Sequence, residues 1–235
     1  KVVGFGALGA ILALFVGPVL AGTAKLGGTP TAIEVDQLAW AIVVAAIATV
    51  AVTVARLIAA VLARATGGGP HFVILVVAAA VVAISALIMQ ALTGESVLFI
   101  VTSGEEMISD LPMLTSVGTV VAIIVLKTIA YAVSLGSGYR GGPFFPAMFV
   151  GAASGLLIAL LLPNGPSVPA AIVVGVVAAV IATAPMKWPI AIVLGIVIGF
   201  AVGTWTLVPA ALIGAVVARL IPRWGDRIAL AGAEH

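Results

Sequence analysis

The chain contains no cysteine, and only 8% of its 235 residues are Asp, Glu, Lys or Arg. The absence of cysteine excludes a disulfide framework and any thiolate metal site. An ordinary soluble domain has about 25% charged residues, so the low charge excludes that class. The net charge of +2 is also too small to indicate a nucleic-acid partner.

Catalytic motifs are missing as well. The sequence has two histidines, both outside the central apolar runs, and neither an HExxH nor a GxSxG motif. An intramembrane enzyme would need an embedded nucleophile with its base, or a metal cluster. We therefore expect no enzymatic activity, no metal site and no cofactor.

Long apolar runs dominate what the chain does contain. Hydrophobic residues make up 63% of it, and the mean hydropathy is +1.38. Several runs are long enough to cross about 30 Å of hydrocarbon. The composition predicts an all-α, polytopic transmembrane protein, which we place in a bacterial plasma membrane.

The apolar runs differ in length, and this difference is informative. They predict helices at residues 2–22, 37–63, 71–92, 117–135, 144–162, 168–183, 188–203 and 205–221. The piece Val97–Val101 is too short to cross and predicts a re-entrant or interfacial turn. Short helices interrupted by Gly or Pro are typical of transporter folds, in which broken helix ends bind ions near the midplane.

Basic residues set the expected orientation, because Lys and Arg concentrate on the cytoplasmic side. Arg56, Arg64 and Arg219 would then lie inside, and the acidic stretch 95–110 outside. The successive long helices would then cross the membrane in alternate directions, as this assignment requires. The C-terminus is predicted to be cytoplasmic. The first residue is Lys and the first apolar run has no cleavage site, so we expect the chain to begin within a larger protein.

Residues 134–155, "SLGSGYRGGPFFPAMFVGAASG", interrupt two apolar runs with glycines, prolines and an arginine. The glycines permit unusual backbone angles, and Pro143 is well suited to a helix start. The N–H groups of Phe144 and Phe145 would point out of that positive helix end, which suits an anion. The alternative is a tight glycine-rich turn that lets two helices pack closely.

The same residues resemble the G-x-F-x-P region of the CLC family of chloride channels and chloride/proton antiporters. The match is Gly142-Pro143-Phe144-Phe145-Pro146, with "GSG" before it and a small-residue helix after it. "APMKWPIAIVLG" and "LVPAALIGAVVARL" resemble the short helices that follow this motif in the family. The resemblance covers essentially the whole chain, but only the second half of the family's fold.

This resemblance implies the second of two inverted repeats that enclose a central anion path, in a homodimer with one pore per subunit. The expected regions are a first span and outer loop (1–36), long helices with an acidic outer loop (37–116), and an anion-site half with a cytoplasmic tail (117–235). The implied partners are chloride or another monovalent anion, protons in the antiporter case, the bilayer and the missing N-terminal half of the fold.

The resemblance also implies the site residues. Backbone amides at the helix start hold the anion in the family, and the matching positions here are Pro143 and Phe144. Phe144 and Phe145 would donate in place of Pro143, or Arg140 would compensate. The other anion-binding candidates are Ser137, Gly138, Arg140, Gly141 and Gly142. Two positions depart from the family: Pro143 has no N–H to donate, and Arg140 stands where proline is common. We expect Arg140 to alter anion affinity or to line the inner entrance; the alternative is that it faces cytoplasmic headgroups.

Other family parts are absent from this sequence. It has no G-R-E-G-P segment with a gating glutamate, no "GSGIP" loop and no inner glutamate, and no tyrosine lies near Ile228, where a pore tyrosine is expected. The resemblance therefore leaves channel and antiporter both open, as well as chloride and fluoride. A different hypothesis is a non-conducting half-protein that serves as an assembly or regulatory module.

Lys127 lies in the middle of a predicted span, where a charge costs about 2.5–3.5 kcal/mol. It should therefore face protein or water. One interpretation is that it adds positive potential to an anion path, and the other is that it pairs with a carboxylate or a helix C-terminus. The acidic loop residues predict either a proton or cation entry or a solvated outer loop. They are Glu95, Glu105, Glu106 and Asp110.

Overall fold

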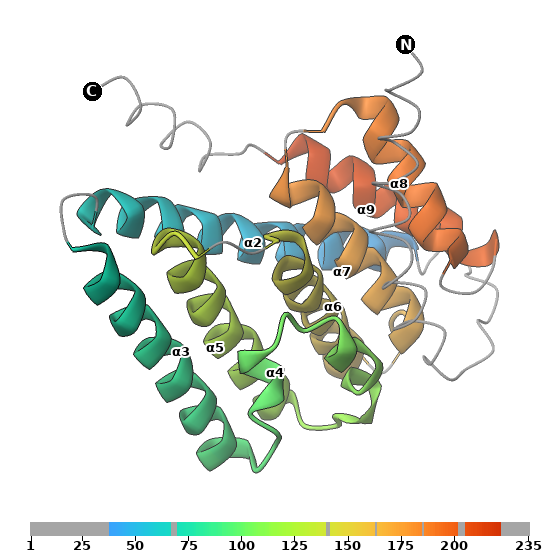
Figure 1. Ribbon diagram of the computed structural model, residues 1–235. Coiled ribbons are helices and arrows are strands. Elements are labelled where there is room, and N and C mark those ends of the chain that lie inside the picture. The colour runs from blue at the N-terminus through green and yellow to red at the C-terminus, as the bar shows by residue number, and fades with distance from the viewer. Residues whose placement is uncertain are drawn as a thin grey trace.

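The computed structural model describes residues 38–66, 70–139, 142–162, 164–184, 186–201 and 205–221 (Figure 1). Within these ranges the chain is all-α, with helices, 3-10 turns and connecting segments but no strand. The predicted first span 2–22 and the basic tail lie outside the described residues.

The helices expected from residue 37 onward are confirmed to within a few residues. They are α2 (Leu38–Thr66), α3 (His71–Thr93), α4 (Leu98–Val101), α5 (Val117–Gly136), α6 (Phe144–Leu161), α7 (Val168–Thr183), α8 (Trp188–Ala201) and α9 (Val208–Leu220). Four of them, α2, α3, α5 and α6, are long and apolar enough to cross a membrane. The others are shorter, as the interrupted runs predicted.

The last predicted helix begins differently from expectation. Residues 205–207 form the 3-10 turn η4 (Trp205–Leu207), and the α-helix starts only at Val208. Pro209 explains the difference, because its nitrogen carries no hydrogen and cannot bond to the carbonyl group of residue 205. An α-helix can accept proline in its first turn but not beyond it.

The segment between α3 and α5 folds back onto the protein instead of crossing the membrane. It contains α4 and two 3-10 turns, η2 (Glu106–Ser109) and η3 (Leu111–Met113), both of which contact α6. Ile108 and Leu111 are buried in this contact. The Val97–Val101 piece is thus a short turn of helix held against the body of the protein.

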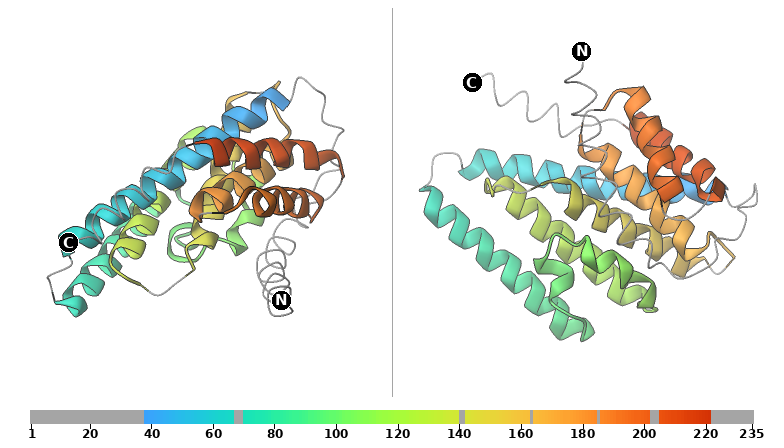
Figure 2. Two further views of the ribbon diagram at one scale, coloured as in Figure 1. Left: turned by 90° about the horizontal axis from the view of Figure 1, so that it is seen from above. Right: turned by 45° about the vertical axis from the view of Figure 1, so that its right-hand side comes forward.

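Helix α2 crosses one end of the helices that carry the site. It contacts α5, α6, α7 and α9, and α3 lies against α5 on the other side (Figure 1). Figure 2 shows α8 and α9 side by side at the end of the molecule away from α3. The described helices therefore form one packed unit in which α6 and α7 are central.

Helices α6 and α7 pack with their main-chain atoms in contact, at glycines that have no side chain. A Cβ atom placed on Gly151 would overlap the carbonyl oxygen of Gly175, and one on Gly155 would overlap that of Ala171. Every residue of α7 from Ala170 to Thr183 is buried. Small residues permit close helix contact here, which suits a bilayer because van der Waals packing is a main attraction between helices in lipid.

Substituting Gly155 with valine should therefore destabilise the protein. The new side chain would meet main-chain atoms that cannot move aside, so we expect the free energy of unfolding to fall by about 3 kcal/mol, the upper end of the usual cost of overpacking. Thermal unfolding of the full-length protein in detergent measures this. Gly118→Ala is the control, because a Cβ at Gly118 meets only the Ser116 hydroxyl at 3.8 Å. Equal melting temperatures for both variants would contradict the close contact.

Candidate functional site

A cavity of about 250 Å³ lies between α3, α4 with the segment after it, α5 and the first turn of α6. Most of its wall is apolar. The polar side chains that line it are those of Thr102, Ser103, Lys127, Tyr131 and Ser134. The glycine-proline motif contributes Gly142, Phe145 and Pro146. None of the described residues on this wall is acidic.

The start of α6 borders the cavity. Pro143 is the residue just before the helix, with φ −72° and ψ −11°, and α6 begins at Phe144. The first N–H groups of an α-helix have no carbonyl partner within the helix, and this end carries about half a positive elementary charge. Pro143 thus begins the helix as predicted, and the positive end of α6 lies at the cavity.

Lys127 is buried, with 2% of its surface exposed. Its Nζ donates to the carbonyl oxygens of Ile100, at 3.1 Å, and Thr102, at 2.5 Å, both at the end of α4. An ammonium group has three N–H donors, and no acceptor for the third lies in the part of the chain described. The helix C-terminus that the sequence left open as a partner is therefore present, and Lys127 also lines the cavity.

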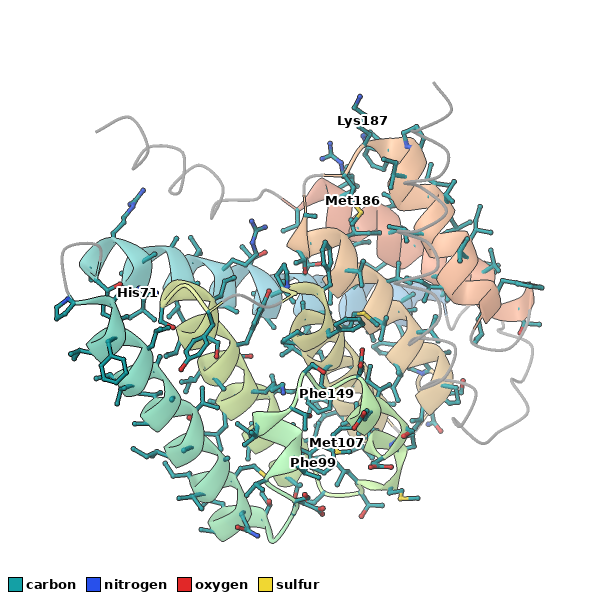
Figure 3. The ribbon with its side chains drawn as sticks, viewed as in Figure 1. His71, Phe99, Met107, Phe149, Met186 and Lys187 are labelled. Atoms are coloured by element: carbon teal, nitrogen blue, oxygen red, sulfur yellow. The ribbon has the colours of Figure 1, made fainter. Side chains whose placement is uncertain are left out.

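An aromatic ring contacts the ammonium group of Lys127. Phe99 of α4 and Phe149 of α6 lie close together, with ring centroids 6.1 Å apart (Figure 3). The Lys127 Nζ is 5.3 Å from the centroid of Phe149, within reach of a cation–π attraction. Gly104 packs directly against Phe149, which leaves no room for a side chain there. The ammonium group is thus held in one place.

Tyr131 is the site residue that sequence reasoning missed. It is 5% exposed, lines the cavity, and its hydroxyl donates to the carbonyl oxygen of Pro143 at 2.9 Å. This bond ties α5 to the first turn of α6. The signal was the spacing: Lys127, Tyr131 and Ser134 are four and three residues apart, which places them on one helix face. The position near Ile228, where the resemblance implies a pore tyrosine, lies outside the described residues.

The turn before the motif, residues 137–139, does not line this cavity. The Ser137 hydroxyl donates to the carbonyl oxygen of Val133 at 2.7 Å, and Ser137 lines a second, apolar cavity of about 300 Å³ between α2, α3 and α5. Gly138 follows with φ +81°, a left-handed conformation that favours glycine. Tyr139 donates from its hydroxyl to the carbonyl oxygen of Leu75 at 2.9 Å, which fastens the turn to α3.

The predicted site residues are therefore only partly brought together. Gly142 and Phe145 share the first cavity with Lys127, and Phe144 packs against the apolar core beside it. Ser137 and Gly138 are not among the residues that line it. Arg140 and Gly141 lie outside the described residues. A buried cation and a positive helix end around one cavity favour an anion electrostatically.

Comparison with known proteins gives a family. The family model described as "Voltage gated chloride channel" matches residues 1–223. Among curated proteins, the "Putative ion-transport protein YfeO" of Escherichia coli O1:K1 / APEC is 50% identical over 52 residues. Proteins with the same name from Escherichia coli (strain K12 / DH10B) and Shigella boydii serotype 18 match to the same extent.

The match to these relatives is short. It covers 22% of this chain and 12% of each relative's own length. No solved structure matches the chain. The family model, by contrast, extends over nearly all of the sequence and includes every described residue that lines the cavity. It agrees with the resemblance carried by the glycine-proline motif and with ion transport in general terms. The chain belongs to the voltage gated chloride channel family.

Proposed function

We propose that the protein to which this chain belongs transports chloride or a similar monovalent anion, and that the anion binds in the cavity at the start of α6. One observation carries the proposal. A buried ammonium group, that of Lys127, and the positive end of a membrane helix line the same cavity, in which no described side chain is acidic.

The backbone amides of Phe144 and Phe145 are the proposed main-chain donors to the anion. Pro143 cannot contribute, because its nitrogen carries no hydrogen. The third N–H of Lys127 compensates in this proposal. At a separation of 4 Å, opposite unit charges attract by about 4 kcal/mol when the effective dielectric constant is about 20. This attraction is as large as the cost of about 2.5–3.5 kcal/mol for placing a lysine at mid-membrane.

The remaining parts of the proposal rest on the family resemblance. We propose a homodimer in a bacterial plasma membrane with the C-terminus in the cytoplasm, in which the N-terminal half of the fold closes the open side of the cavity. Gly138, Gly141 and Ser137 would shape the turn that leads to Gly142, and Arg140 would tune anion affinity at the inner entrance. Both a channel and a proton-coupled antiporter are compatible with this arrangement.

The test of this function is anion efflux from liposomes that contain the full-length protein. We expect chloride efflux well above that of empty liposomes, and a pH electrode then separates an antiporter from a channel. Comparison of chloride with fluoride tests the ion's identity. Absence of efflux for every halide would contradict transport and favour the non-conducting module.

Lys127→Met should lower chloride efflux at least about tenfold, which corresponds to the loss of about 1.4 kcal/mol of anion binding. Lys127→Arg keeps a charge with more donors and should retain part of the efflux. The matched control is Lys187→Met, since Lys187 is exposed and lies at the far end of the molecule from Phe149 (Figure 3). Gel filtration of each variant checks its assembly. Equal efflux from the Lys127→Met and Lys187→Met variants would contradict the role of Lys127.

A bromide-soaked crystal of the full-length protein locates the anion directly. We expect anomalous density beside the start of α6, at hydrogen-bond distance from the amides of Phe144 and Phe145 and near the Nζ of Lys127. In Lys127→Met crystals the density should weaken. Bromide found only away from α6 in the native crystal would contradict the site while leaving transport itself possible.

A further inference from the structure

The second cavity, which lies between α2, α3 and α5, has an apolar wall. Two hydroxyl groups line it, and both donate within their own helices. The Thr66 hydroxyl bonds to the carbonyl oxygen of Leu62 at 2.8 Å. The Ser137 hydroxyl bonds to the carbonyl oxygen of Val133 at 2.7 Å. The other side chains on the wall are aliphatic. Ligand pockets have volumes of about 300–1,000 Å³, so this cavity of about 300 Å³ is large enough for a ligand, and its wall suits an apolar one.

The cavity opens on the outer side of the described helices. Helix α3 packs against α4 and α5 and lies at the edge of this group of helices (Figure 1). Val73 and Val77 of α3 line the cavity and are 52% and 56% exposed. Because α3 is long and apolar enough to cross a membrane, exposed aliphatic side chains on it suit contact with lipid. An acyl chain that lies along α3 can therefore enter the cavity.

His71 lies at one end of the cavity wall. It begins α3 and precedes the lining residues Ile74 and Ala78 by three and seven positions, which places the three on one face of the helix. A Cβ placed on Gly138 would lie 3.6 Å from the Cε1 atom of His71, so the ring is beside the residue that follows Ser137 of the wall. Figure 3 shows His71 at the corner between α2 and α3. Its imidazole is exposed and can donate a hydrogen bond to a group at this end of the cavity.

The charge near this end of the cavity is positive. Arg64 lies in the last turn of α2 and is exposed, and only residues 67–70 separate α2 from α3. Helices α2, α3 and α5, which form the wall, contain no acidic residue. This end is the one that the sequence predicts to be cytoplasmic. A basic residue near that membrane surface strengthens the binding of anionic lipids about fivefold.

We propose that the second cavity binds one acyl chain of an anionic phospholipid from the surrounding membrane, and that His71 donates a hydrogen bond to its phosphate group. The apolar wall takes the chain, and the charge of Arg64 selects a negative headgroup. This inference goes beyond the proposed function and does not depend on it. The chain would lie against Gly136 and Ser137, at the end of α5 that leads to the glycine-proline motif.

Native mass spectrometry of the full-length protein tests this proposal. The protein is stripped of lipid in detergent and titrated with phosphatidylglycerol, or with phosphatidylcholine that has the same acyl chains. We expect phosphatidylglycerol to bind about fivefold more tightly than phosphatidylcholine, and Arg64→Gln should remove this difference. Phosphatidylglycerol should also raise the melting temperature of the native protein, because a ligand that binds the folded state stabilises it.

Two valines of α3 form a matched pair. Val77 lines the cavity and is 56% exposed, whereas Val76 is 51% exposed and does not line it. Val77→Trp should fill the cavity and weaken phosphatidylglycerol binding at least about tenfold, which corresponds to about 1.4 kcal/mol. Val76→Trp adds the same ring outside the cavity and should bind as the native protein does. His71→Ala should weaken binding about tenfold, since it removes a hydrogen bond to a charged group, whereas Lys187→Met should leave binding unchanged.

Equal losses in the two valine variants would overturn the proposal, because the lipid would then lie on the surface of α3. Equal binding by the native and His71→Ala proteins would overturn the phosphate contact. Absence of tight lipid binding to the native protein would overturn the site altogether, and would indicate that the rest of the protein or a second copy covers the cavity. None of these outcomes bears on transport, which the liposome measurements report separately.

Discussion

The carbonyl groups at the ends of short helices are the constraint on which this structure depends. In a bilayer they cannot bond to water, so the protein must supply a donor for them. Three basic side chains from neighbouring helices do this. Lys127 bonds to Ile100 and Thr102 at the end of α4, Arg56 to Ala182 at the end of α7, and Arg219 to Met186 just beyond it. The chain has few charged residues, and these three donate hydrogen bonds to carbonyl groups where the helices are interrupted.

Where the chain passes from one helix to the next, the end of the first helix and the start of the second favour groups of opposite charge. A C-terminal end requires a cation or another donor, whereas an N-terminal end attracts a negative group. The chain brings the two kinds of end close together, since Lys127 serves the end of α4 and lines the cavity at the start of α6. The charge that bonds to the end of α4 therefore also lines the cavity. One lysine thus serves two positions in a chain that has few charges.

The sequence was sufficient for local structure and insufficient for contacts across the chain. Apolar runs and their bounding Gly and Pro residues predicted the described helices, and the G-P-F-F-P motif predicted the start of α6. The exception is the start of α9, where Pro209 allows only a 3-10 turn before the α-helix. The partner of Lys127 stayed open because the fold of residues 97–113 has no regular period. Arg56 bonds to Ala182, which is 126 positions away in the sequence, and no local sequence pattern predicts a contact over that separation.

The contact between α6 and α7 through bare glycine backbone has a mechanical consequence. Helices that interlock at Gly151, Gly155 and Gly175 cannot slide or rotate against each other without a clash of main-chain atoms. The two helices therefore move as one rigid body, and the positive end of α6 keeps a fixed position relative to α7. Any rearrangement that opens or closes the cavity must come from its other walls, which are α3, α4 with the segment after it, and α5.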